Sequence, residues 1–301
     1  MAYSGGSGIS TDPYQIASLS DINQLKADVV AGLTNDVYYK QTADITLGTF
    51  EPIGYKSTTP FYYSFNGFYD GNYKVLKDGT ISYPGKDYIG IFAFAGQSNY
   101  LDDGLLNIIV NNVSVSGRNY IGVISGRING ELRQCTTDSS CVVTGTANYI
   151  GGIAGSIANG SFTNCKNSAS VTGVDYVGGI VGHVSNGKSG GCILNCHNLA
   201  DITGRNRVGG LVGFLEGNTN YYAYVYNTIN SGNISGVSYV GGIAGYSSYT
   251  SLYCAVKNSY ALNDSITRLS GTATTFGRIV GYGTDLNNNY ALDTMEFISI
   301  P

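Results

Sequence analysis

A seven-residue phrase that recurs along the chain limits the possible fold more than any other feature. Each good copy begins with Tyr or Arg, continues with an apolar residue and glycine, and ends in glycine after two small or apolar residues. The copies start at intervals of 27 to 36 residues, about 31 on average. This period is typical of stacked solenoid units, none of which buries its apolar face alone. The good copies are Tyr120–Gly126, Tyr149–Gly155, Tyr176–Gly182, Arg207–Gly213 and Tyr239–Gly245, and weaker ones lie at Tyr88–Phe94 and Thr275–Gly281.

Other columns of residues keep the same register. Asn and Asp tolerate left-handed backbone and suit a tight corner, so the column before the phrase predicts a corner of the coil. A further column of asparagines predicts a ladder of stacked amides. Its alternative, a set of calcium ligands, requires adjacent carboxylates that the sequence lacks. The corner column is Asp87, Asn119, Asn148, Asp175, Asn206 and Ser238; the ladder column is Asn167, Asn198, Asn230, Asn258 and Asn288, preceded two residues earlier by Cys165, Cys196, Thr228, Val256 and Leu286.

These columns predict an all-β fold, a single-stranded β-solenoid (right-handed parallel β-helix) with coils about 4.8 Å apart. The units are too short and too glycine-rich for helical repeats, and their apolar residues are mostly β-branched. Val177 and Ile180 are three residues apart, so a straight strand would place them on opposite faces. Because both columns are apolar, we expect the chain to bend at Gly178–Gly179 and Tyr176 to point outward.

The first part of the chain lacks the regular phrase. We expect residues 1–85 to form an N-terminal cap with a short helix and irregular first coils, and 86–301 to form one continuous domain of repeats. Residues 20–30 read as the helix, with Ser20 as N-cap and Gly32 as the stop. Such a helix would cover the open end of the solenoid, where strand addition otherwise occurs. Its apolar face consists of Ile22, Leu25 and Val29.

Composition excludes several classes of protein. Of 301 residues, 43% are hydrophobic, 16 are Lys or Arg and 20 are Asp or Glu, so the chain has neither the low hydrophobicity nor the high net charge of a disordered protein. The net charge of −4 provides no basic surface for nucleic acid. No stretch approaches 18 apolar residues, so we expect no membrane insertion. The start lacks a signal region, which leaves a cytosolic protein or the mature form of an exported one.

Several of these segments resemble the GLUG repeat, and the resemblance covers nearly the whole chain. Departures occur at Val123, at Arg278 and in the copy Ile91–Phe94. GLUG repeats occur in large bacterial surface proteins, including filamentous adhesins and immunoglobulin A peptidases. The resemblance therefore implies a location at the bacterial cell surface or outside the cell, and a scaffold without fixed chemistry. The segments that carry it are Gly152–Gly155, Gly179–Gly182, Gly210–Gly213, Gly242–Gly245, Asn164–Asn167, Gly8–Ile16 and Phe65–Asn72.

Patterns for catalysis or metal binding are missing from the sequence. A zinc protease needs two histidines one helical turn apart with a glutamate between them. The two histidines here, His183 and His197, are fourteen residues apart. Glycan cleavage uses converging carboxylates, whereas no column in this register holds acids in successive coils. We therefore expect no catalytic residue, no metal and no cofactor.

Six cysteines leave the question of disulfides partly open. Cys165 and Cys196 share a column, and Cys135 falls close to it. Side chains in one column run parallel, which is a poor match to the disulfide dihedral angle. We expect mostly free thiols, with one bridge possible among Cys141, Cys192 and Cys254.

The chain contains 26 tyrosines, and this is the one compositional excess that the predicted fold alone does not explain. Tyrosine gives broad amphipathic contact at low entropic cost, which suits recognition, although aromatic ladders also simply cover the edges of coils. The candidate ligand-binding residues are Tyr120, Tyr149, Tyr176, Arg207, Tyr239, Tyr221, Tyr222, Tyr224 and Tyr246.

The sequence predicts a non-enzymatic adhesin module that binds a glycan, or a protein of a host or partner cell, through ladder faces rich in Tyr, Asn and Ser. The alternative is a structural spacer or self-assembling subunit. The last segment, 295–301, has no obvious helix, and an open strand edge there would allow a homo-oligomer. A glycan lyase or hydrolase is the third hypothesis.

Overall fold

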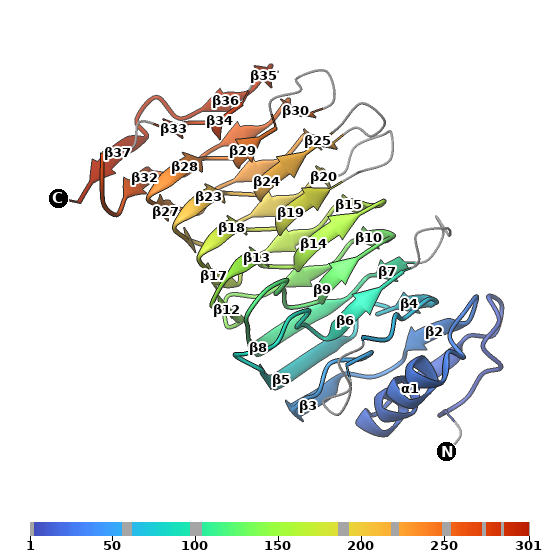
Figure 1. The fold of residues 1–301 in the computed structure, drawn as a ribbon. Helices are drawn as coiled ribbons and strands as arrows, with labels where there is room; N and C mark the ends of the chain where they lie inside the picture. Colours follow the sequence, from blue (N-terminus) through green and yellow to red (C-terminus); the bar gives the residue numbers. More distant parts are fainter. Residues whose placement is uncertain are drawn as a thin grey trace.

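A computed structural model shows a parallel β-solenoid with one helix at its N-terminal end (Figure 1). The structure describes residues 3–55, 62–96, 104–185, 193–217, 223–248, 254–272, 275–283 and 286–300. Equivalent strands of successive coils pair in parallel and in register, which confirms the predicted stacking. No helix in these residues is long and apolar enough to cross a membrane.

One coil of the repeat passes through four sheets. Its strands are β13 (Asn148–Gly151), β14 (Ala154–Ala158), β15 (Ser161–Thr163), β16 (Lys166–Asn167) and β17 (Ser170–Thr172). The phrase spans the first two of these strands, and a sharp bend separates them.

The five-stranded and seven-stranded sheets contain the two strands of the phrase. Besides β13, the five-stranded sheet contains β18 (Asp175–Gly178), β23 (Asn206–Gly209), β28 (Ser238–Gly241) and β33 (Phe276–Gly277). Besides β14, the seven-stranded sheet contains β6 (Phe92–Ala95), β9 (Ser125–Ile128), β19 (Val181–Ser185), β24 (Val212–Glu216), β29 (Ala244–Ser247) and β34 (Val280–Tyr282).

The ten-stranded and fifteen-stranded sheets form the rest of each coil. Besides β15, the ten-stranded sheet contains β1 (Tyr14–Ile16), β2 (Tyr38–Gln41), β4 (Phe68–Asp70), β7 (Gly104–Leu106), β10 (Glu131–Arg133), β20 (Ile193–Leu194), β25 (Ala223–Tyr226), β30 (Cys254–Lys257) and β35 (Leu286–Asn287). Besides β16 and β17, the fifteen-stranded sheet contains β3 (Ile45–Thr49), β5 (Val75–Ser82), β8 (Ile109–Gly117), β11 (Thr136–Thr137), β12 (Val142–Gly145), β21 (His197–Asn198), β22 (Ile202–Thr203), β26 (Ile229–Asn230), β27 (Ile234–Gly236), β31 (Tyr260–Ala261), β32 (Ser265–Arg268), β36 (Tyr290–Ala291) and β37 (Glu296–Ser299).

The predicted bend inside the phrase is confirmed. Val177 and Ile180 are both fully buried, and the chain passes from β18 to β19 between them. Gly179 lies at this bend, where a Cβ would be 2.3 Å from the carboxamide carbon of Asn198. The glycine pair therefore makes room for an asparagine side chain inside the solenoid, in addition to permitting the bend.

A ladder of buried amides runs through the core beside these glycines. Asn167 Nδ2 donates to Asn198 Oδ1 at 2.9 Å, and Asn198 Nδ2 donates to Asn230 Oδ1 at 2.8 Å. The ladder continues to Asn263, whose Oδ1 accepts from Asn230 at 3.3 Å. At its other end Thr137 Oγ1 donates to Asn167 Oδ1 at 2.6 Å. The predicted structural ladder is thus present in these coils, with its amides paired as buried polar groups require.

The prediction was wrong for Asn258 and Asn288. Both have left-handed backbone, with φ of 49° and 52°, and they belong to a different column, together with Asn164, Asn195 and Asn227. In the coils of Asn167, Asn198 and Asn230 such a left-handed asparagine stands three residues before the buried one, so the two kinds look alike in sequence. Val256 and Leu286, which were expected to continue the column of Cys165 and Cys196, pair with each other on the ten-stranded sheet. The cysteine column continues through Thr228 and Ser259.

The cysteines are small buried groups. All five described cysteines are free thiols, and Cys192 lies outside the described residues. Cys165 and Cys196 follow one another in their column, with the backbone N–H of Cys165 donating to Cys196 Sγ at 3.4 Å. Burial raises the pKa of both thiols well above its ordinary value, so they stay protonated. The other described cysteines are Cys135, Cys141 and Cys254.

Helix α1 (Leu19–Ala31) covers the N-terminal end of the solenoid, as predicted (Figure 1). Its buried face consists of Ile22, Leu25 and Val29 together with Asp21. The N-cap is Ser18 instead of Ser20, because the Ser18 hydroxyl accepts from the Asp21 backbone N–H. The Asp21 carboxylate in turn accepts from the hydroxyls of Ser18 and Ser4. Burial by itself would raise the pKa of Asp21, but these hydrogen bonds outweigh it and lower the pKa. Gly32 ends the helix, as predicted, and it does so in the left-handed conformation, with φ of 71°.

Candidate functional site

In six of the seven copies the first residue of the phrase lies in left-handed backbone, on the five-stranded sheet or in line with it. An aromatic residue with positive φ is uncommon and strained, because it lacks the local hydrogen bonds that help Asn or Asp adopt this conformation. The predicted corner geometry is therefore present one residue later than expected, on the tyrosine column instead of the Asn/Asp column. The φ angles are 56° at Tyr88, 58° at Tyr120, 65° at Tyr149, 59° at Tyr176, 54° at Arg207 and 55° at Tyr239.

The tyrosine rings of this column stack face to face. Ring centroids are 4.5 Å apart for Tyr88 and Tyr120, 4.6 Å for Tyr120 and Tyr149, and 4.8 Å for Tyr149 and Tyr176. Because neighbouring rings cover these faces, a ligand meets mainly ring edges and hydroxyl groups. The hydroxyls of these four tyrosines and of Tyr239 form no hydrogen bond with any residue that the structure describes. The column therefore presents a row of phenol groups with free hydrogen-bonding capacity.

Arg207 takes the place of a ring where the stack is interrupted. Its guanidinium carbon lies 4.8 Å from the centroid of the Tyr176 ring and 5.5 Å from that of Tyr239. The centroids of the Phe214 and Tyr246 rings lie 5.8 and 5.1 Å from it. Four rings thus surround one cation, an arrangement stabilised by cation–π attraction.

A second column runs beside the first on the outer face of the seven-stranded sheet. His183 stacks on Phe214 with ring centroids 5.1 Å apart, and its ring also lies 5.1 Å from that of Tyr149. His183 Nε2 lies 2.8 Å from Glu216 Oε2, and this hydrogen bond lowers the pKa of Glu216.

We call the two columns together the aromatic corner. Its members are Tyr88, Tyr120, Tyr149, Tyr176, Arg207 and Tyr239, with Phe94, Arg127, Ser156, His183, Phe214, Tyr246 and Tyr282.

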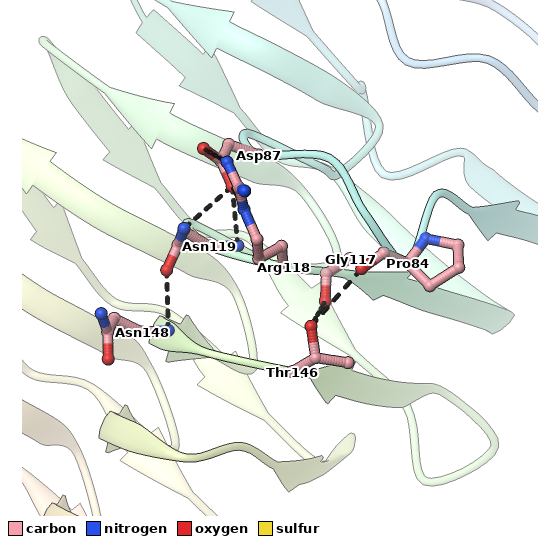
Figure 2. Close-up of polar contacts among 7 residues, drawn as sticks. All are labelled: Pro84, Asp87, Gly117, Arg118, Asn119, Thr146 and Asn148. Carbon is pink, nitrogen blue, oxygen red and sulfur yellow. Dashed lines mark hydrogen bonds and ion pairs between the residues drawn. The ribbon is translucent and has the colours of Figure 1, made fainter.

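Polar side chains join successive coils beside the aromatic corner (Figure 2). Arg118 donates two hydrogen bonds of 2.8 Å to the Asp87 carboxylate, and Asn119 Nδ2 donates to it at 2.9 Å. In the next coil the backbone N–H of Asn148 donates to Asn119 Oδ1 at 2.9 Å. Burial alone would raise the pKa of Asp87, but the bonds from Arg118 and Asn119 lower it. These bonds join three successive coils next to the tyrosine column.

The structure brings together six of the nine residues predicted as a ligand site. Tyr120, Tyr149, Tyr176, Arg207 and Tyr239 share the first column, and Tyr246 lies beside them in the second. Tyr224 lies on β25 of the ten-stranded sheet, near Lys257, and is not part of the corner. Tyr221 and Tyr222 lie outside the described residues.

Sequence reasoning missed His183 and Phe214. In the good copies their column stands seven residues after the first residue of the phrase, and its mixture of Arg, Ser, His, Phe and Tyr resembles a variable surface position. The signal that was available is the recurrence of aromatic residues in that column.

A second feature that the sequence did not predict is a hollow on the outer face of the fifteen-stranded sheet. It has a volume of about 560 Å³ and is open to solvent. Tyr260 and Tyr290 stack along it with ring centroids 5.2 Å apart, and they are 43% and 58% exposed. We call it the Asn–Tyr hollow. It is lined by Asn227, Ile229, Asn258, Tyr260, Asn288 and Tyr290.

The phenol row and the Asn–Tyr hollow offer hydrogen bonding by neutral groups, and Arg207 adds one cation to the aromatic corner. Burial, together with the neighbouring Tyr88 and Tyr149, raises the pKa of Tyr120 to about 12, so its phenol stays protonated near neutral pH. Within the described residues, no three or more His, Cys, Asp or Glu side chains are grouped so that they could hold a metal ion.

Comparison with known proteins identifies the repeat and the fold. Residues 146–172 match the model of the GLUG motif, so the chain is a β-solenoid that carries this motif. Over 179 residues, which make up 55% of this chain and 2% of the relative, it is 31% identical to halomucin of Haloquadratum walsbyi. The chain thus spans a small part of the length of that protein. The crystal structure of a Bacteroides ovatus protein, described provisionally as an immunoglobulin A1 protease, has the same fold. It superimposes with a TM-score of 0.69 at 22% identity, covering 96% of this chain and 87% of the other.

Proposed function

We propose that this chain is a non-enzymatic, adhesin-type module of a bacterial cell-surface protein, and that it binds a glycan along the aromatic corner. The GLUG motif supports the surface location, because the repeat is typical of large surface proteins. The observation that carries the binding role is the row of phenol hydroxyls that have no partner among the described residues. The likeness to the Bacteroides ovatus protein supports the fold alone and transfers no activity.

Ring stacking stabilises the fold and explains why the first column is aromatic. It does not explain why these rings carry hydroxyl groups. Phenylalanine would stack equally well, and Phe94 and Phe214 occupy the second column. The first column nevertheless has tyrosine in all five of its aromatic positions. Asparagine, the residue at most other non-glycine positions with positive φ, would relieve the backbone strain. A repeating row of neutral donors and acceptors is suited to the repeating hydroxyls of a glycan, which is why we favour a glycan over a protein ligand.

The test removes three hydroxyls and keeps the stack, in the triple variant Tyr120→Phe/Tyr149→Phe/Tyr176→Phe. We expect the free energy of unfolding to change by less than about 0.5 kcal/mol, because the hydroxyls have no partner in the fold. Binding on a glycan array should weaken at least about tenfold, since each lost hydrogen bond contributes about 0.5–1.5 kcal/mol.

Tyr73→Phe is the matched control, because Tyr73 is also left-handed (φ 56°) and exposed but lies outside the corner. It should bind as the unmodified chain does. Full binding by the triple variant, or binding to host-matrix proteins and to no glycan, would contradict the proposal.

A specific observation also favours self-assembly as a second candidate function. The last described coil exposes several large apolar side chains, and a second copy of the chain that packs on this coil would bury them. Sedimentation equilibrium over a concentration series tests it, and a monomer at every concentration would count against assembly. The exposed fractions are 45% for Leu286, 58% for Tyr290, 50% for Phe297 and 41% for Ile298.

A further inference from the structure

We infer that the Asn–Tyr hollow is a separate contact site for a neutral, polyhydroxylated chain. This inference rests on the proposed glycan binding and assigns it a second place on the solenoid, on another sheet from the aromatic corner. None of the six side chains that line the hollow carries a charge.

The asparagines of the hollow keep their full hydrogen-bonding capacity. The side-chain amides of Asn227, Asn258 and Asn288 form no hydrogen bond in the part of the chain that the structure describes. Each amide has two donor hydrogens and one acceptor oxygen. In an early coil of the same column, Asn107 Nδ2 donates to Asp70 Oδ1 at 2.8 Å, so that amide is partly engaged. The left-handed backbone explains why asparagine occurs here, and it leaves the amide groups free for a ligand.

The opposite side of the hollow becomes aromatic only in these coils. The strand position that Tyr260 and Tyr290 occupy holds the apolar Val75 and Ile109 in the first coils, and then Thr136, Lys166 and His197. Ile229 then precedes the two tyrosines. Apolar surface beside a few polar groups is the usual composition of a small-molecule site, and here the polar groups are amides.

Charge and spacing define the class of ligand. With no Lys, Arg or His in the lining, the hollow offers an acidic polysaccharide or a nucleic acid no ionic attraction. Equivalent residues of neighbouring coils lie about 4.8 Å apart, so the three amides form a row of about 10 Å. A ligand that uses all three must repeat its hydroxyls along the solenoid axis. A neutral oligosaccharide meets both conditions.

The test replaces the three amides in the variant Asn227→Gly/Asn258→Gly/Asn288→Gly. Glycine keeps the left-handed backbone without strain, so the fold is retained while the amides are lost. The control is Asn164→Gly/Asn195→Gly, which lie in the same column with φ of 56° and 52° but outside the hollow. The probes are hexasaccharides of glucose, mannose and N-acetylglucosamine, with hexagalacturonate as the acidic probe, all followed by calorimetric titration.

We expect at least one neutral hexasaccharide to bind the full chain, about tenfold or more weaker binding by the triple variant, and unchanged binding by the control. Equal affinity of the triple variant and the full chain, or a preference for hexagalacturonate, would overturn the inference. Thermal unfolding that is unchanged in both variants shows that they remain folded. If Tyr260→Ala/Tyr290→Ala also binds with full affinity, the hollow has no role.

The two proposals fail in distinguishable ways. If no oligosaccharide binds the full chain, the proposed function itself is wrong. If a glycan binds and the tyrosine-to-phenylalanine variant of the aromatic corner weakens it, while the glycine variant of the hollow does not, the proposed function stands and the hollow is not a site.

Discussion

Gly182→Ala is expected to lower the free energy of unfolding by about 3 kcal/mol or more. A Cβ at this position would lie 2.4 Å from the backbone nitrogen of Ile150 and 2.5 Å from the carbonyl carbon of Tyr149. Both atoms belong to the backbone of the preceding coil, so the clash is relieved only if the coils move apart and their inter-strand hydrogen bonds lengthen. Overpacking of this kind commonly costs 1–3 kcal/mol, and more where no side chain can yield, hence our estimate of about 3 or more. Urea unfolding followed by circular dichroism measures the change.

Gly85→Ala is the matched control for this substitution. No atom lies within 4 Å of a Cβ placed on Gly85, and its backbone is not in the left-handed region. We expect a change within about 0.5 kcal/mol. If Gly182→Ala lowers the free energy of unfolding as little as Gly85→Ala does, neighbouring coils are not closely packed at the left-handed tyrosines.

Asn198→Ala is expected to cost about 3 kcal/mol or more, because it breaks the buried ladder in its middle. Asn198 is fully buried, and its amide bonds to Asn167, Asn230 and the backbone carbonyl of Ala200. Removing it takes this partner from two donors, Asn167 Nδ2 and the Ala200 backbone N–H, and from two acceptors, Asn230 Oδ1 and the Ala200 carbonyl. Each such loss costs about 1–3 kcal/mol. The same urea experiment measures the effect.

Asn195→Gly, three residues earlier in the same coil, separates this effect from a general sensitivity of the coil. Asn195 is left-handed, with φ of 52°, and glycine accepts that conformation. We expect a small change for Asn195→Gly. A comparable loss of stability in the two variants would mean that the buried amides do not hold the coils together.

The fold was largely predictable because the solenoid repeats its constraints in every coil. The paired apolar columns of Val177 and Ile180 required a bend, and the glycines between them showed where it lies. The two kinds of asparagine could not be separated from sequence. A buried amide and a left-handed turn favour the same residue, so Asn258 was assigned to the wrong column.

The candidate site was predictable as a column of tyrosines, but its chemistry was not. The sequence placed Tyr149 and Tyr176 in neighbouring coils, and only the structure shows that their faces cover each other and leave the hydroxyls outward. The strained backbone of these residues has no sequence signature, because tyrosine is an unusual residue for positive φ. The Asn–Tyr hollow was not predictable because Asn258 and Asn288 were assigned to the buried ladder. With that assignment, the sequence did not place them beside Tyr260 on the surface.

The central claim is that the chain binds a glycan without cleaving it, and one measurement tests both halves. The full chain is equilibrated with the glycan that gives the strongest array signal, and the dissociation constant is determined by calorimetry. The glycan is then recovered after prolonged incubation, and its length, reducing ends and unsaturated ends are measured. We predict saturable binding and recovery of the intact glycan. New reducing or unsaturated ends would identify a hydrolase or lyase, and the absence of binding to any glycan would contradict the account.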